Sequence, residues 1–181
     1  RAWVNTYGIP AVISNCSNNY GPWQFPEKLI PLTIIKALNN QPIPIYGDGL
    51  QIRDWLFVDD HSRAIAKILL KGRNGETYNI GGNEEKSNLE IVNLICEILD
   101  ILVPNKKLRK YSELITHVQD RPGHDRRYAM DTSKVNKELN WFPQETFTTG
   151  IEKTVHWYIK NDKWYDHILK ETYKGERLGL K

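Results

Sequence analysis

Short apolar runs alternate with longer stretches of helical spacing along this chain. The short runs are rich in β-branched residues and bounded by Gly, Pro or Asn, which predicts strands at Ala11–Ser14, Ile43–Tyr46, Ile52–Val58, Thr77–Ile80 and Ile115–Val118. Apolar residues recur every three or four positions in Lys28–Leu38, Asp59–Leu70, Asn88–Leu102, Thr132–Leu139 and Thr148–Tyr158, which predicts helices there. Alternating strands and helices are typical of an α/β fold.

The ends of these helices carry recognisable signals. Ser87 or Asn88 is expected to cap the Asn88–Leu102 helix, and Asp131 or Thr132 the helix that follows. In the Asp59–Leu70 helix we expect a buried face made of Ala64, Ile65, Ile68 and Leu69. The first residues read as the last turns of a helix that ends at Gly8, so we expect a fragment whose upstream part is missing. The tail from Lys160 has weaker periodicity.

Composition excludes several classes of protein. With 181 residues, 40% of them hydrophobic, the chain can bury a core, and its net charge of +3 is too small to indicate a nucleic-acid-binding protein. The basic cluster Lys106–Lys110 lacks interleaved aromatics and is interpreted as a solvated loop. Cys16 and Cys96 form no disulfide framework and are expected to be small buried residues of a reducing, cytoplasmic protein. Neither a membrane-spanning run nor a signal peptide is recognisable.

Three polar segments at predicted strand ends are the candidate binding loops, since α/β proteins place ligands there. They are Ser14–Pro22, Gln51–Trp55 and Asp120–Tyr128. Arginines in the last two could grip phosphate through paired N–H donors, which predicts a phosphorylated small molecule as ligand. Structural roles stay open for Asn18 and Asn19 as capping residues, and for Arg53 as an exposed arginine paired with Asp54.

Several other residues could suggest a function, but a structural interpretation is simpler for each of them. Asp59 and Asp60 precede an apolar periodic segment and are expected to cap a helix rather than act as paired catalytic carboxylates. The histidines lack ligand spacing, so no metal site is predicted. The tryptophans Trp3, Trp141, Trp157 and Trp164 are expected in the core or at a domain interface. The chain contains neither a glycine-rich dinucleotide loop nor a tyrosine followed four residues later by lysine.

These segments resemble the dTDP-glucose 4,6-dehydratase family, a branch of the extended short-chain dehydrogenases/reductases. The resemblance rests on Ser14–Pro22, Phe25–Pro31, Pro44–Gly47, Gln51–Trp55, Tyr78–Gly82 and, most particularly, Asp120–Tyr128. It implies an NAD-binding Rossmann domain, of which residues 1–24 would be the end. Residues 25–181 would form mainly the sugar-nucleotide-binding domain, with some segments returning to the Rossmann sheet. The family's catalytic Tyr/Lys and Asp/Glu pairs would lie upstream, so no catalytic residue is assigned here.

The resemblance also implies binding roles for individual residues. Asn18 would contact the substrate and Asn19 the nicotinamide side of NAD. The remaining substrate contacts would come from Lys28, Leu29, Pro44, Ile45, Tyr46, Arg53, Asn88, Asp120, Arg121, Pro122, Gly123 and His124. Of these, Pro44, Ile45 and Tyr46 would flank the thymine base, and Arg53 and Arg121 would clamp the diphosphate.

By the same resemblance, the parent enzyme would convert dTDP-glucose to the 4-keto-6-deoxy sugar nucleotide and water in deoxysugar synthesis, as a homodimer. Two alternatives stay open. One is another extended-family enzyme, such as an epimerase or a UDP-glucuronate decarboxylase. The other, for this chain alone, is a non-catalytic module that binds sugar nucleotides.

Overall fold

Three parallel strand pairs organise residues 2–171, the part of the chain that the computed structural model describes. β1 (Ile13–Cys16) pairs with β5 (Thr77–Ile80), β2 (Asn18–Tyr20) with β4 (Ile52–Phe57), and β3 (Ile43–Tyr46) with β7 (Ile115–Val118). The short strands β6 (Glu85–Ser87) and β8 (Arg127–Tyr128) extend the sheet that contains β4. The helices are α1 (Ala2–Tyr7), α2 (Leu29–Leu38), α3 (Val58–Lys71), α4 (Asn88–Leu102), α5 (Ser133–Leu139), α6 (Phe147–Lys160) and α7 (Asp162–Glu171), with a 3₁₀ turn at Tyr111–Leu114. Parallel strands interleaved with helices confirm the predicted α/β class.

The described residues fall into two units, each built from three chain segments. The first comprises residues 2–20, 53–85 and 127–150, and the second residues 21–52, 86–126 and 151–171.

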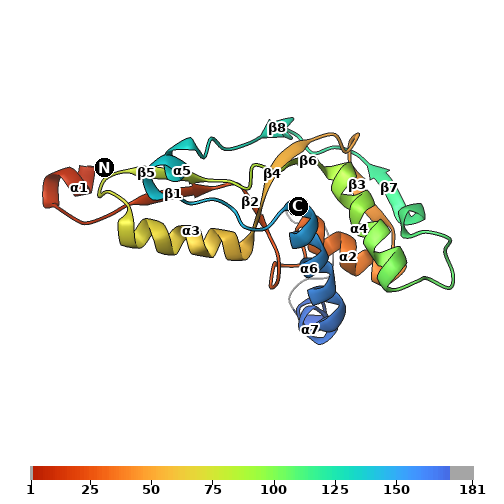
Figure 1. Ribbon diagram of the computed structural model, residues 1–181. Coiled ribbons are helices and arrows are strands. Elements are labelled where there is room, and N and C mark those ends of the chain that lie inside the picture. Colours follow the sequence, from red (N-terminus) through yellow and green to blue (C-terminus); the bar gives the residue numbers. More distant parts are fainter. Residues whose placement is uncertain (1, 172–181) are drawn as a thin grey trace. The chain divides into compact units, whose positions relative to one another are not determined.

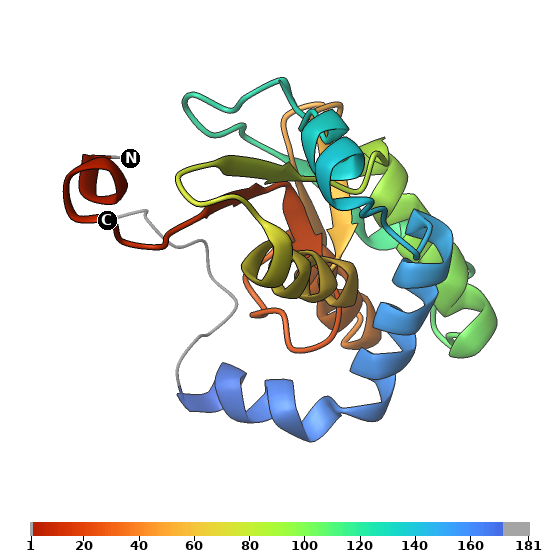
Figure 2. The ribbon, with the colours of Figure 1, turned by 60° about the vertical axis from the view of Figure 1, so that its left-hand side comes forward.

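In the first unit, α3 runs alongside β1 and β5 (Figures 1 and 2). Its core gathers apolar side chains from β4, α3, β5, α5 and the residue Trp141: Leu56, Ala64, Ile68, Tyr78, Ile80, Val135, Leu139 and Trp141. Tyr20 extends the buried region, since its ring packs edge-on against Phe57 and its hydroxyl donates to the backbone oxygen of Phe147 over 3.3 Å. Burial raises the pKa of this tyrosine well above its ordinary value, so it stays neutral.

In the second unit, α2 packs against α4, and β3 pairs with β7 (Figure 1). The buried faces of the two helices follow the predicted periodicity, with Ile30, Ile34, Ile91, Ile95 and Leu99 all fully buried. Pro31 occupies the first turn of α2, where its missing N–H costs no hydrogen bond.

Most predicted elements are confirmed, and the exceptions have physical causes. The first strand begins at Ile13 rather than Ala11, and it is not buried: Ile13 is 45% exposed, because β1 pairs only with β5 among the described residues. The Ser14–Pro22 segment, expected to be a loop, continues β1 to Cys16 and then forms β2. The tail contains α7, which its weak periodicity did not predict, and residues 172–181 lie outside the described part.

Helix α3 departs from expectation on two points. It begins at Val58, and neither Asp59 nor Asp60 is its N-cap, because both lie in the first helical turn after Phe57. Ala64 and Ile68 are buried as expected, but Ile65 is 45% and Leu69 77% exposed. The apolar stripe of this helix is therefore wider than the surface that the described residues cover.

The tryptophans and cysteines are buried to different degrees. Trp3 is 67% exposed and lies on α1, so it is not a core residue in the described part of the chain. Trp141 is buried, whereas Trp157 and Trp164 are half-buried and pack with the exposed Trp23 at ring-centroid distances of 4.8 and 5.4 Å. Cys96 is buried and Cys16 half-buried, and both are free thiols.

Candidate sugar-nucleotide site

The carboxyl ends of β3 and β7 bring the turn after Tyr46 close to the start of the candidate loop after Val118 in the second unit. In the parallel register Tyr46 lies opposite Val118, so the turn after Tyr46 and the loop after Val118 leave the same edge. Two hydrogen bonds tie them: the Gly47 N–H donates to the Val118 oxygen over 3.0 Å, and His117 Nδ1 donates to the Gly47 oxygen over 2.8 Å. This edge is where an α/β protein is expected to bind its ligand.

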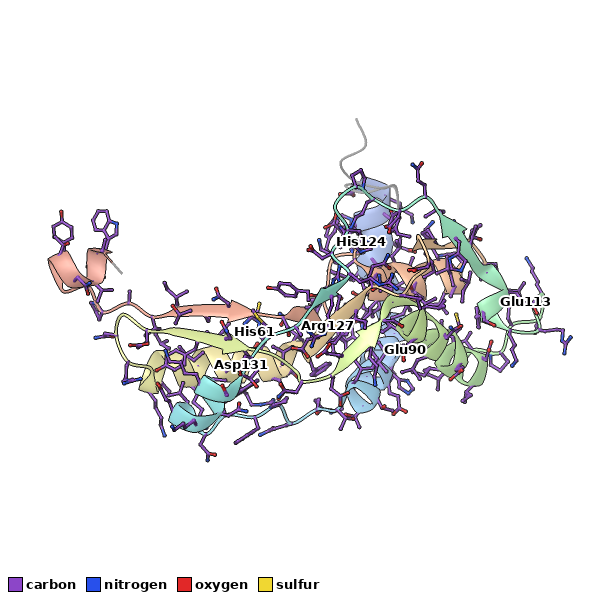
Figure 3. The ribbon with its side chains drawn as sticks, turned by 90° about the horizontal axis from the view of Figure 1, so that it is seen from above. His61, Glu90, Glu113, His124, Arg127 and Asp131 are labelled. Atoms are coloured by element: carbon purple, nitrogen blue, oxygen red, sulfur yellow. The ribbon has the colours of Figure 1, made fainter. Side chains whose placement is uncertain are left out.

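The Asp120 carboxylate organises the loop that follows β7. It accepts hydrogen bonds from the Arg121 backbone N–H over 2.8 Å, from His124 Nδ1 over 2.7 Å and from Gln51 Nε2 over 3.0 Å. The hydrogen bond from His124 is the main cause that holds the pKa of the Asp120 carboxyl below its ordinary value. His124 lies on the long segment between β7 and β8 (Figure 3). The loop is therefore held in shape by groups on both sides of the carboxylate.

Gly47 allows the turn to approach this carboxylate closely. Its φ of +59° is in the left-handed region, and a Cβ at this position would come within 2.7 Å of the Asp120 Oδ2 atom. Glycine meets both the steric and the conformational requirement.

Of the three arginines in the Asp120–Tyr128 segment, Arg121 presents an uncommitted guanidinium. Arg126 makes a double contact with the Asp48 carboxylate at 3.1 and 2.9 Å. Arg127 does the same with Glu85 at 2.6 Å for both contacts. Arg121 is exposed, and no side chain within residues 2–171 hydrogen-bonds or ion-pairs with its guanidinium. Arg121 is thus the arginine of this segment with its paired donors available for an anion.

Strand β3 offers alternate side chains to the two sides of the sheet. Pro44 and Tyr46 are half-buried, whereas Ile45 is 1% exposed and faces the core with Ile43. The Ile45 side chain therefore has almost no exposed surface, and the role of Ile45 beside a base stays a prediction.

Asn88 is the first residue of α4, and the local sequence fixes its place. Ser87 is the N-cap in a capping box: Ser87 Oγ accepts from the Glu90 N–H over 3.3 Å, and Glu90 Oε2 accepts from the Ser87 N–H over 2.7 Å. Hydrogen bonding from Ser87 lowers the pKa of Glu90, which is labelled in Figure 3. The Asn88 N–H donates to the Gln51 oxygen over 3.1 Å, which ties α4 to the segment before β4.

A hollow of about 520 Å³ opens beside this helix start. It is lined by three apolar and four polar or charged residues: Leu50, Ile52, Ser87, Leu89, Glu90, Asn93 and Arg126.

Lys28 and Leu29 lie at the start of α2. The Lys28 side chain is 57% exposed and pairs with Glu27 at 2.5 Å, and Leu29 is half-buried. Pro122 and Gly123 are exposed, and Gly123 has a φ of +67° with open space around it, so these residues form the tip of the loop.

The other candidates, Asn18, Asn19 and Arg53, belong to the first unit. Asn18 lies opposite Trp55 in the parallel pairing of β2 with β4, and Asn19 Nδ2 donates to the Ser17 oxygen over 3.0 Å. Arg53 is 8% exposed, which contradicts the interpretation of an exposed, solvated arginine. A buried arginine is retained where a specific partner or ligand compensates its charge.

The carboxylate next to Arg53 has a structural role. Asp54 is buried and accepts from the Gly82 N–H over 3.1 Å and from the Glu84 N–H over 2.9 Å. Two buried polar atoms nearby, Ser17 Oγ and Trp55 Nε1, have no hydrogen-bond partner within residues 2–171. Such groups are commonly completed by water or a ligand.

Sequence reasoning missed Gln51. Gln51 belongs to the Gln51–Trp55 segment but was not predicted as a site residue, although it is 3% exposed and its side chain is hydrogen-bonded to Asp120, 69 residues away. Only the position of Gln51 directly before Ile52 and Arg53 in that segment could have pointed to it.

Comparison with known proteins shows which family this chain belongs to. The family model described as GDP-mannose 4,6 dehydratase matches residues 1–154. The chain belongs to this family. Among curated relatives, it is 56% identical over 181 residues to a dTDP-glucose 4,6-dehydratase of Neisseria meningitidis and 54% identical over 182 residues to one of Escherichia coli. Each alignment covers 99% of this chain but only 51% and 50% of the relative. The chain therefore spans about half the length of these relatives.

Solved structures of the family share the fold. A dTDP-glucose 4,6-dehydratase from Bacillus anthracis in complex with NAD matches with a TM-score of 0.80 and 48% identity, over 92% of this chain and 50% of that one. One from Streptomyces venezuelae with NAD bound gives 0.82 and 42%, over 92% and 49%. A UDP-glucose 4-epimerase from Thermotoga maritima gives 0.76 and 25%, over 88% and 49%. These matches confirm the expected resemblance and the Rossmann-type α/β class of extended family members.

No helix within residues 2–171 is both long and apolar enough to cross a membrane. In the same part of the chain, no cluster of His, Cys, Asp or Glu has the arrangement of a metal site.

Proposed function

We propose that this chain is the substrate-binding portion of an NAD-dependent dTDP-glucose 4,6-dehydratase. The observation that carries the proposal is the uncommitted Arg121 guanidinium on a loop braced by Asp120, His124 and Gln51. A diphosphate matches the paired donors of an arginine, and charge-assisted bonds of this kind are the stronger ones. The relatives at 54–56% identity are dehydratases for dTDP-glucose, whereas the solved epimerase is only 25% identical.

The proposed roles follow the chemistry of each side chain. Arg121 holds the diphosphate, and the Asp120–His124 turn keeps its backbone in place. Pro44 and Tyr46 offer half-buried apolar surface to the base. Asn88 has a half-buried amide that makes no hydrogen bond to residues 2–171, so both its donor and its acceptor are available to the substrate. Lys28 and Leu29, at the start of α2, are proposed to contact the nucleotide.

In the first unit, Asn18 and Arg53 are proposed as further substrate contacts. Asn19 is the residue proposed to face the cofactor, since a half-buried carboxamide on β2 is complementary to the carboxamide of nicotinamide. When bound, NAD would supply the hydride acceptor for the oxidation of the sugar. This chain has no glycine-rich dinucleotide loop, so the pyrophosphate of NAD has no such loop to hold it here.

For these 181 residues alone we propose binding without turnover. No tyrosine in the chain is followed four residues later by lysine, so the proton-transfer pair of the family is absent from it. The complete enzyme is proposed to act in the cytoplasm as a homodimer, by the same resemblance.

Calorimetric titration of dTDP-glucose into the chain tests the proposal, with UDP-glucose as competitor. We expect binding that prefers dTDP-glucose and is lost in Arg121→Ala. Arg109→Ala, which removes an exposed arginine from another loop, is the matched control and should bind like the wild type. If chain that is folded by circular dichroism does not bind dTDP-glucose, the proposal is wrong.

A further inference from the structure

Gln51 is a buried amide whose two ends have different surroundings. It is 3% exposed, and its Nε2 donates to the Asp120 Oδ2 atom over 3.0 Å. Its other end, Oε1, is buried and receives no hydrogen bond from residues 2–171. The orientation is determined by chemistry, since an ionised carboxylate only accepts and therefore requires the NH₂ end of the amide. A buried acceptor is thus left facing away from Asp120.

The backbone on either side of this amide belongs to the candidate site. The Gln51 oxygen accepts from the Asn88 N–H over 3.1 Å, at the start of α4. The same Asp120 carboxylate binds the Arg121 N–H and His124 Nδ1 through its Oδ1 atom. Gln51 therefore joins two segments proposed to contact the sugar nucleotide, and its side chain cannot rotate freely because Nε2 is held.

We propose that Gln51 Oε1 accepts a hydrogen bond from an N–H or O–H group of the bound sugar nucleotide and so acts as a specificity-determining residue. This inference rests on the proposed function and deepens it. The diphosphate cannot be the partner, because at neutral pH its oxygens act as acceptors. The remaining donors of dTDP-glucose are the imide N–H of the base and the hydroxyls of its two sugars.

A residue that only braces Asp120 would behave differently. If Gln51 only braces Asp120, its loss should weaken the binding of every ligand that contacts the Asp120 loop. The loss of affinity should then be the same whether or not the ligand carries a particular hydrogen-bond donor. A direct hydrogen bond instead couples one donor of the ligand to Gln51. Once the Gln51 side chain has been replaced, removing that donor from the ligand should hardly change the affinity, and the reverse should also hold. Coupling between a residue and a ligand group is thus the readout that separates the two roles.

The experiment is calorimetry on the 181-residue chain with dTDP-glucose, dTDP, N3-methyl-dTDP and 3′-deoxy-dTDP. In the wild type we expect the absence of one donor to weaken binding about tenfold, the size of one hydrogen bond. Comparing N3-methyl-dTDP and 3′-deoxy-dTDP with dTDP assigns that donor to the base or the deoxyribose. Comparing dTDP with dTDP-glucose, which removes all four glucose hydroxyls together, assigns it to the glucose. In Gln51→Leu the penalty for the same removal should be about tenfold smaller than in the wild type. Gln119→Leu, at an exposed glutamine, is the matched control and should keep the full tenfold effect.

The outcomes are distinct. Suppose that the wild type binds dTDP-glucose but that removing each donor weakens binding by no more than about twofold. Gln51 then accepts from none of these donors, and the wild-type data alone overturn the inference. Equal penalties in wild type and Gln51→Leu overturn it as well. Gln51→Met replaces Gln51→Leu if the latter does not fold. Wild type that is folded and binds none of the four compounds overturns the proposed function itself.

Discussion

His124 Nδ1 lies 2.7 Å from Asp120 Oδ1, and both residues belong to the loop that presents Arg121. The His124 side chain is nearly buried, with 6% exposed, while the Asp120 side chain is 39% exposed. The histidine therefore acts as an internal brace of the loop, and the proposed anion contact is left to Arg121.

Replacing His124 by alanine should raise the pKa of the Asp120 carboxyl toward its ordinary value, because the hydrogen bond from His124 is the main cause of its lowering. In the wild type the stabilisation from this lowered pKa is complete above the ordinary carboxyl pKa of about 3.9 and is lost as pH falls through the lowered value. Carbon-13 NMR titration of the carboxyls measures the change. Asp131, whose pKa is lowered mainly by the Ser133 N–H, should titrate unchanged. An unchanged Asp120 titration would contradict the assigned cause.

Asp60 should be far more sensitive to substitution than its neighbour. Its fully buried carboxylate accepts from the Gln144 N–H over 2.7 Å and the Glu145 N–H over 3.0 Å, and it pairs with Arg63. Asp60→Ala should lower the free energy of unfolding by about 3 kcal/mol, because these donors lose their acceptor. Asp59→Ala, at an exposed position, should change it by less than about 0.5 kcal/mol. Urea denaturation gives both values, and similar losses would show that burial does not decide the effect.

Local sequence signals predicted the helices and strands well where residues close in the sequence determine the structure. Helix α4 begins and ends at the predicted residues, because the Ser87 capping box and the apolar periodicity are both local. Asp60 shows the limit of such signals. Its charge and position suggested a helix cap, but its backbone partners are Gln144 and Glu145, 84 and 85 residues away.

For the candidate site, too, the sequence predicted the segments but not the contacts between them. Motifs named the Asp120 loop, but not which of its arginines is uncommitted, because Asp48 and Glu85 are recruited from distant strand ends. The alternation in β3 could have shown that Pro44 and Tyr46 share one side and Ile45 the other. The burial of Gln51 and Arg53 depends on tertiary packing and could not be predicted from local sequence.

Gly82 should not tolerate a side chain. A Cβ at this position would lie 1.8 Å from the Trp55 oxygen, so the backbone of β4 would have to move. Gly82→Ala should therefore lower the free energy of unfolding by more than about 3 kcal/mol. Gly8→Ala isolates the conformational cost, since Gly8 has a φ of +65° but open space, and should cost about 1 kcal/mol. Thermal unfolding compares the two, and a Gly82→Ala variant as stable as Gly8→Ala would refute the close approach.

The Ser87 cap should matter for both stability and binding. Ser87→Ala leaves the Glu90 N–H without its acceptor, which should cost about 1 kcal/mol of unfolding free energy. Because Asn88 is the next residue, affinity for dTDP-glucose should also fall. Ser62→Ala, at an exposed serine inside α3, should change neither quantity appreciably. Loss of stability without loss of affinity would contradict the expectation that the Ser87 cap positions Asn88 for the ligand.

The exposed apolar residues of α3 should promote self-association of the 181-residue chain. Ile65 is 45%, Leu69 77% and Leu70 80% exposed on the same helix, and contiguous apolar surface of this kind favours aggregation. The double variant Ile65→Glu with Leu69→Lys should reduce the sedimentation-velocity fraction of oligomers. Its free energy of unfolding should stay within about 0.5 kcal/mol of the wild type, because exposed positions contribute little to the core. Substituting the exposed α4 residue Ile101 by lysine is the control for a charge introduced at an exposed apolar position outside α3. Equal improvement by Ile101→Lys would indicate that the loss of any exposed apolar side chain, rather than of the α3 surface, reduces association.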